Sequence, residues 1–399
     1  DLTGHEIERA LMKRVKRHHN IDIYEHHFAV DILTQHHLGR LVKKSTPDIT
    51  CFGAYVLNLK KHEIYTVLAK VTVMATGGVG NIYHTTTNPS VATGDGVAMV
   101  HRAKGVIENM EFIQFHPTSL YNPGERPSFL ITEAMRGFGG LLRLQNGKEF
   151  MQKYHPMGSL APRDVVARSI DHELKISGEE FVYLDITHKD PKEVMSHFPN
   201  IYKKCLSIGI DLTKDMIPVV PAAHYCCGGI KVNLNGESSI RRLYALGEAS
   251  STGLHGGNRL ASNSMMEAAV YADAAARHAI SVIDSIELQR DIPAWDYEGT
   301  AVPEEMALIT QDYKEMQQIM TNYVGIVRSD VRLERAKRRL EIIFKETEEL
   351  YLKSTLSQHL CELRNMIAVG YLIIKQAEAR HESVGLHYSI DYPAKPVEI

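Results

Sequence analysis

The sequence predicts an α/β protein with a separate helical region at its C-terminal end. The chain has 399 residues, a length typical of two or three domains. Residues 71–75 form a short apolar run, rich in β-branched side chains, that ends in a glycine turn, as a buried strand does. After Pro303, apolar residues recur every three or four positions to about Arg380, which predicts a helical bundle.

The first hundred residues are predicted to contain a helix at each end and strands between them. Ile7, Leu11 and Val15 share one helical face, and residues 97–104 favour a second helix. The turn-like residues 58–62 separate two apolar runs and predict a hairpin. The predicted strands are residues 21–24, 28–33, 51–57, 63–68 and 71–75.

The middle of the chain mixes short strands, glycine-rich loops and helices. Pro162 stands at the expected first position of a helix over residues 162–174, where a proline loses no hydrogen bond. The remaining predicted segments are a strand and loop at 243–248, a helix at 264–278 and a linker at 291–295.

Composition and charge exclude several classes of protein. Hydrophobic residues make up 44% and charged residues 23%, as in soluble globular chains, and the net charge of -3 is too weak to attract nucleic acid or an acidic membrane. The five cysteines, with Cys226 next to Cys227, favour reduced thiols. No run of eighteen apolar residues occurs, and no histidine pair has zinc-ligand spacing with cysteine. We therefore expect a cytoplasmic protein with no metal, no membrane and no nucleic-acid partner.

Two glycine clusters are candidates for ligand contact. Gly77 and Gly78 follow a predicted strand, where glycine lets the backbone approach a bulky ligand closely. Gly94 and Gly96 precede a predicted helix, whose N–H groups favour an anion. Each cluster alone is more typical of an ordinary turn, and no G-x-G-x-x-G occurs in the chain.

Several side chains could hold a substrate with two carboxylates. A guanidinium grips a carboxylate through two parallel hydrogen bonds, and neutral histidine or threonine can add donors. The candidates are Arg136, Arg163, Arg168, Arg259, His116, Thr132 and His224. For any one of them alone, a structural role is the stronger interpretation. No G-x-S-x-G occurs, and buried free thiols at Cys226 and Cys227 are favoured over a Cys–His or redox pair.

Taken in order, five motifs resemble the succinate dehydrogenase and fumarate reductase flavoprotein superfamily. The motifs are Phe115-His116-Pro117-Thr118, Thr132-Glu133-Ala134-Met135-Arg136-Gly137, the segment Leu160–Arg168, Pro221-Ala222-Ala223-His224-Tyr225, and Gly247-Glu248-Ala249-Ser250 with residues 254–264. Within the superfamily, Arg-Leu-Ala-Ser-Asn-Ser-Met-Met-Glu at residues 259–267 resembles the L-aspartate oxidase branch. Two departures from the pattern are Phe138 and Val384, which stand where the family has a glutamate and an arginine.

The resemblance implies a fold of three parts. It implies an incomplete Rossmann-like FAD-binding domain at residues 1–110 and 227–288, an inserted α+β capping domain at 111–226, and a helical bundle at 289–399. The first strand with its G-x-G-x-x-G is expected to be missing. A catalytically incomplete fragment is therefore one alternative, and a fumarate reductase or succinate dehydrogenase flavoprotein is the other.

The resemblance also implies an activity, which is oxidation of L-aspartate to iminoaspartate by hydride transfer to non-covalent FAD. Oxygen or fumarate would reoxidise the flavin, and quinolinate synthase, in NAD (pyridine nucleotide) biosynthesis, would consume the product. The implied catalytic residues are Arg163 and Glu133, and the implied substrate-binding residues are His116, Thr132, His224 and Arg259. The residues implied to lie along FAD are Thr76, Gly77, Gly78, Asp95, Glu248, Ser264 and Met265.

Overall fold

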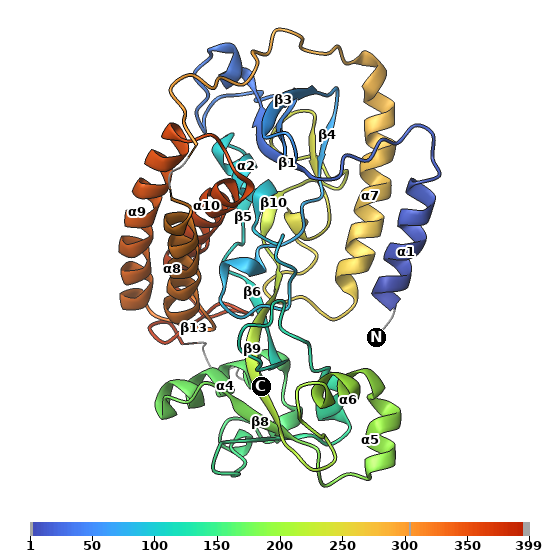
Figure 1. The fold of residues 1–399 in the computed structure, drawn as a ribbon, viewed down its shortest axis with the longest axis vertical. Coiled ribbons are helices and arrows are strands. Elements are labelled where there is room, and N and C mark those ends of the chain that lie inside the picture. The colour runs from blue at the N-terminus through green and yellow to red at the C-terminus, as the bar shows by residue number, and fades with distance from the viewer. Residues whose placement is uncertain (1–2, 303–304, 394–399) are drawn as a thin grey trace.

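The molecule combines several short sheets with long helices that cover its two sides (Figure 1). This computed structural model describes residues 3–302 and 305–393. The helices are α1 (Thr3–Val15), α2 (Asp95–Arg102), α3 (Glu133–Gly137), α4 (Arg163–Ser177), α5 (Pro191–His197), α6 (Pro199–Leu206), α7 (Asn263–Val282), α8 (Ala307–Tyr323), α9 (Asp330–Lys353) and α10 (Gln358–Ala379). The strands are β1 (His27–Leu33), β2 (Gly53–Asn58), β3 (Glu63–Leu68), β4 (Thr72–Met74), β5 (Ile107–Glu108), β6 (Ile113–Leu120), β7 (Leu141–Arg143), β8 (Val182–Asp185), β9 (Ile217–Cys226), β10 (Gly229–Lys231), β11 (Leu243–Ala245), β12 (Ser250–Ser251), β13 (Val327–Arg328) and β14 (Tyr388–Ser389).

The sheets include both antiparallel and parallel strand pairs, and some of the paired strands are distant in the sequence. Strands β1, β2 and β3 form an antiparallel meander, and β4 pairs in parallel with the distant β11. Strand β10 joins β5 to β12. The largest sheet has the antiparallel order β6-β9-β8-β7 and lies at the lower end of the molecule with α4, α5 and α6 (Figure 1).

Two hydrophobic clusters lie at the two ends of the long strands β6 and β9. Ile113 and Ala223 belong to the larger cluster, which also contains the meander and the C-terminal helices. Leu120 and Val219, at the other ends of the same strands, belong to a separate cluster within residues 120–219. The middle of each strand therefore spans the junction between the two clusters.

The C-terminal helices form a bundle around α10. Apolar residues cover nearly every side of α10, which is why α2, α8 and α9 all pack against it. Ser329 and Ser357 cap α9 and α10 by accepting hydrogen bonds from the backbone N–H groups of Arg332 and Leu360. No helix in the described part of the chain is long and apolar enough to cross a membrane.

Most predicted elements are confirmed, including the hairpin of β2 and β3 and the C-terminal helices. Residues 21–24 are an exception, because they form no strand. The strand at residues 71–75 exists as β4, but it is only partly buried, because Met74 lies in the core while Val73 is 49% exposed. Pro162 is the N-cap of α4 rather than its first residue. Pro303 lies outside the described residues.

Candidate active site

His116 and His224 lie on the paired strands β6 and β9, where these strands pass from one hydrophobic cluster to the other. Each histidine lies beside an irregularity in the pairing. Phe115 pairs with Ala223 and Gln114 with Tyr225, so His224 is an extra residue in β9. A second shift follows His116, where proline at position 117 interrupts the strand. Such bulges redirect a side chain locally. They bring the two imidazole rings to 5.5 Å between centroids.

Both histidines are held in the neutral form. Burial and the nearby charges of Arg259 and Arg163 lower the pKa of His224 to about 4. Burial, with His224 and Arg163 nearby, holds the pKa of His116 well below its usual value. The hydroxyl of Thr87 lies 2.8 Å from Nδ1 of His224. Neutral imidazoles beside two arginines suit the binding of anions, because they add hydrogen-bond donors.

Glu133, at the start of α3, forms ion pairs with two arginines, Arg163 and Arg136. The Nε of Arg163 donates to its Oε2 at 3.0 Å, Nη2 of Arg163 donates to the same oxygen, and Arg136 lies 3.2 Å from Oε1. Burial opposes ionisation of this carboxyl, but the hydrogen bond from Arg163 and the two guanidinium charges lower its pKa. Arg136 is 1% exposed, and burial lowers its pKa. Thr132 caps α3, so the threonine and the carboxylate share a helix start.

Arg259 approaches the same space from the loop before α7. Its Nη1 donates to Ser264 Oγ and its Nη2 to Gln114 Oε1, both at 3.0 Å. The guanidinium carbon lies 4.3 Å from the centroid of the Tyr225 ring, a cation–π contact. The Nε of Arg259 is buried and has no hydrogen-bond partner within the described structure, which leaves a donor available to a ligand.

A buried network supports the tyrosine under Arg259. The Tyr225 hydroxyl donates to Glu267 Oε2 at 3.2 Å and lies 3.2 Å from Nε2 of His255. The same Glu267 carboxylate lies 2.8 Å from that nitrogen and accepts from the Thr252 hydroxyl. The Tyr225 ring is therefore held at its hydroxyl end.

Several residues predicted to lie along FAD are buried or hydrogen-bonded, and Glu248 is the most constrained of them. Glu248 accepts the Cys226 N–H at 2.9 Å and lies so close to Gly78 that a Cβ there would collide with the carboxylate. Burial raises the pKa of Glu248 to about 7. Ser264 lies with Arg259, Met265 is 43% exposed, and the Asp95 carboxylate accepts from Thr93 and from Asn365 of α10.

The loop after β4 fits a flat ligand that comes close to the backbone. Gly77 has a φ of +72°, and a Cβ placed there would meet no atom within 4 Å. The hydroxyl of Thr76 is buried without a hydrogen-bond partner in the described structure. An open backbone beside an unpaired donor suits a polar heteroaromatic ring, so these residues fit FAD.

The structure thus brings together His116, His224, Arg163, Glu133, Thr132 and Arg259 and also Arg136, while Arg168 points elsewhere, to Asp164 and the Tyr388 ring. Sequence reasoning missed the supporting residues Gln114, Tyr225, Thr87 and Glu267. Gln114 gave little signal, since four of the eight residues of β6 are polar. All five cysteines are free and buried, and no group of three or more metal-ligating side chains occurs among the described residues.

Two family models match the chain. The model described as "FAD binding domain" matches residues 1–265, and the model described as "Fumarate reductase flavoprotein C-term" matches residues 313–396. The first covers more than half of the chain.

Curated relatives and solved structures agree with these models. L-aspartate oxidase 1 of Ralstonia nicotianae is 47% identical over 98% of this chain and 72% of its own length, and the L-aspartate oxidase of Pseudomonas aeruginosa is 46% identical over the same shares. A quinol fumarate reductase FrdA of E. coli matches with a TM-score of 0.82 and 28% identity over 100% of this chain and 71% of its own. Sdh1 of Mycobacterium smegmatis matches with a TM-score of 0.77 and 30% identity over 96% and 66%.

Proposed function

The chain belongs to the L-aspartate oxidases, within the succinate dehydrogenase and fumarate reductase flavoprotein superfamily, and from this we propose how its residues act. The protein is an FAD-dependent oxidoreductase that converts L-aspartate to iminoaspartate, and its activity belongs to NAD biosynthesis. We propose that Arg163, Arg259, His116 and His224 hold the two carboxylates of the substrate.

The convergence of these four side chains on one space is the observation that carries the proposal. The rings of His116 and His224 lie 5.5 Å apart, and the charge of Arg163 reaches His116, His224 and Arg259. A dicarboxylate would neutralise both arginines and occupy the unpaired Nε of Arg259. Losing one such buried pair typically costs about 2–5 kcal/mol. Thr132, at the start of α3, would add a neutral donor.

Glu133 and Arg163 are proposed as the residues that hold and move a proton. Their hydrogen bond places a carboxylate beside a guanidinium that borders the substrate space, and Arg136 lies on the other carboxylate oxygen. A carboxylate between two guanidinium groups keeps both cations oriented, and the chain Arg163–Glu133–Arg136 offers a path for a proton. Arg163 would contact the substrate, and Glu133 would fix and tune it.

FAD, when bound, supplies the two-electron oxidation. We propose that residues 1–110 and 227–288 form its binding domain, that residues 111–226 cap the substrate, and that residues 289–399 form the helical bundle. Thr76, Gly77, Gly78, Glu248, Ser264 and Met265 would hold FAD non-covalently. Asp95 would act from the start of α2, held by its bonds to Thr93 and Asn365.

We further propose a cellular setting for the reaction. The buried free thiols support a reducing compartment, and we infer the cytoplasm. Oxygen or fumarate would accept the electrons. Iminoaspartate hydrolyses readily in water, so direct consumption by quinolinate synthase would protect it.

Hydrogen peroxide production tests the function. With FAD added, the chain should release peroxide from L-aspartate and show little turnover of succinate. An Arg163→Gln variant should lose most of that turnover. Turnover of succinate without turnover of L-aspartate would favour the dehydrogenase alternative, and near-normal turnover in the variant would contradict the role of Arg163.

A further inference from the structure

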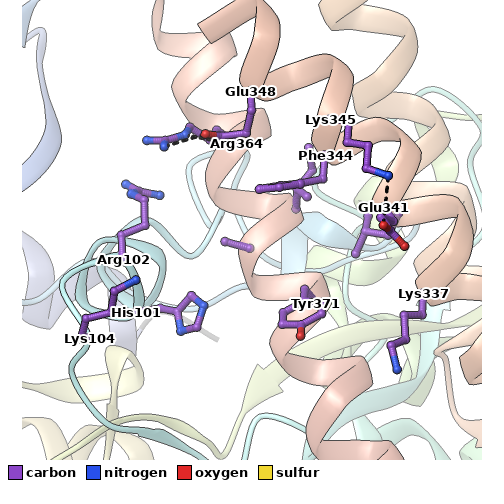
Figure 2. A pocket seen from close by; sticks show the side chains of 13 residues that line it. His101, Arg102, Lys104, Lys337, Glu341, Phe344, Lys345, Glu348, Arg364 and Tyr371 are labelled. Atoms are coloured by element: carbon purple, nitrogen blue, oxygen red, sulfur yellow. Dashed lines mark hydrogen bonds and ion pairs between the residues drawn. The ribbon is translucent and has the colours of Figure 1, made fainter. Parts of the chain in front are cut away.

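A second cavity lies away from the candidate active site, between the end of α2 and the facing sides of α9 and α10 (Figure 2). Its volume is about 550 Å³, within the range of small-molecule sites. None of the side chains assigned to substrate or FAD lines it. The cavity therefore needs an explanation of its own.

The floor of the cavity is apolar and partly uncovered. Phe344 is 46% exposed and Tyr371 39% exposed, although both lie on long helices whose neighbouring Leu340 and Ile367 are 2% exposed. These two rings, on α9 and α10, and the buried aliphatic residues beside them form a surface on which a flat apolar group would lose water.

Some of the cationic side chains at the rim of the cavity form ion pairs, and one does not. Lys345 is paired with Glu341 at 3.1 Å and Arg364 with Glu348, on the α9 and α10 side of the cavity (Figure 2). Lys104, an exposed lining residue that follows α2 on the opposite side, forms no ion pair within the described part of the chain. The exposed ammonium of Lys104 is therefore a cation at the rim that is available to a ligand.

The environment of His101 gives an independent sign of positive potential on that side. Burial and then the charges of Lys104, Lys44, Arg102 and Lys375 lower its pKa to about 4. Of these cations, Arg102 is paired with Asp31 at 3.1 Å, while Lys104 has no ion-pair partner in the described part of the chain. Anions are attracted to such a place.

We propose that this cavity binds a small amphipathic anion, an aromatic carboxylate. Its carboxylate contacts Lys104 and His101, and its ring lies on Phe344 and Tyr371. The ion pairs of the far rim leave no further unpaired cation there, which favours one anionic group on the ligand. The site does not depend on the flavin or on the function proposed above, because it shares no residue with either.

Calorimetry on the full chain with 2-naphthoate tests the proposal. The neutral isostere 2-naphthamide should bind at least about tenfold more weakly, since it lacks the charge that meets Lys104. Lys104→Met should lower the affinity for 2-naphthoate by about tenfold. Lys60 is an exposed lysine in the β2–β3 turn, and the control Lys60→Met should leave this affinity unchanged. Equal binding of the two probes, or an unchanged Lys104→Met, would overturn the anion site.

Two further readouts test the position of the ligand. Phe344→Ser should weaken the binding of 2-naphthoate. Because Phe344 is half-exposed, this substitution should leave the protein folded. The pKa of His101, followed by NMR against a His101→Gln reference, should rise when 2-naphthoate binds, so binding should be tighter at pH 5 than at pH 7.5. A His101 resonance that does not respond to a saturating ligand would place the ligand elsewhere.

Discussion

The guanidinium of Arg259 is oriented by three neighbours of different chemistry. Gln114 and Ser264 accept its hydrogen bonds, and the Tyr225 ring lies against its face. A lysine could not satisfy this arrangement, because its single ammonium has no planar fork to stack and bond at the same time. The position of the cation therefore depends on residues that need not touch the substrate.

Replacement of Tyr225 tests this dependence. Tyr225→Leu removes the ring, and the KM for L-aspartate should rise by about threefold to thirtyfold, as expected for a cation–π contact of about 0.5–2 kcal/mol. Steady-state kinetics with FAD added would measure it. The matched Tyr225→Phe keeps the ring and should stay nearer to wild type. Equal losses in both variants would mean that the hydroxyl network, rather than the ring, positions Arg259.

Replacement of Glu133 tests the proton-moving role. Glu133→Gln keeps the shape but removes the anion between Arg163 and Arg136, so kcat should fall by about 10²–10³ while KM changes much less. The acid limb of the pH–rate profile, set by the lowered pKa of this carboxyl, should also disappear. A variant with an unchanged profile would leave Glu133 with a structural role only.

At the scale of elements, the two irregular strands do most to build the site. The sequence predicted only unplaced short strands in the middle of the chain, and the resemblance named the two histidines. Neither could predict that an extra residue in β9 would turn His224 toward His116. A bulge depends on the pairing of two strands, and here the paired residues are about a hundred positions apart in the sequence. The contact of Tyr225 with Arg259 was missed for the same reason.

One buried amide adds hydrogen bonds to the apolar packing of α2 against α10. Asn365 donates to Asp95 at 2.8 Å and accepts from Arg102 at 2.7 Å, and it is 1% exposed. Asn365→Leu should lower the free energy of unfolding by about 2–5 kcal/mol, because a carboxylate and a guanidinium each lose a partner. Urea denaturation would measure this change. The control Lys375→Leu, exposed on the same helix, should stay within about 0.5 kcal/mol of wild type.

At the scale of the whole molecule, the site lies between two hydrophobic clusters that β6 and β9 connect. Composition and helical periodicity predicted the C-terminal bundle well, since its signal is local. The failure at residues 21–24 and the exposed Val73 of β4 have a common cause, because a short apolar run does not reveal whether partners cover it.

Glu248 makes the stability of the apoprotein depend on pH. Its pKa in the folded protein is about 7, above its ordinary value, so the unfolded chain releases the proton first and stability falls as pH rises from about 4.5 to about 7. Glu248→Gln removes this contribution. The variant should be more stable than wild type at pH 8, by up to about 3 kcal/mol, and no more stable at pH 4. Thermal melts at both pH values would contradict this if the difference did not depend on pH.

The affinity of the FAD-loaded protein for succinate and for butyrate, measured by calorimetry, tests most directly whether four side chains form a cradle for two carboxylates. Succinate should bind about 30-fold or more tightly than butyrate, which has one carboxylate, and Arg259→Lys should remove most of that difference. Equal affinities for the two acids, or a preference that survives the substitution, would contradict the cradle.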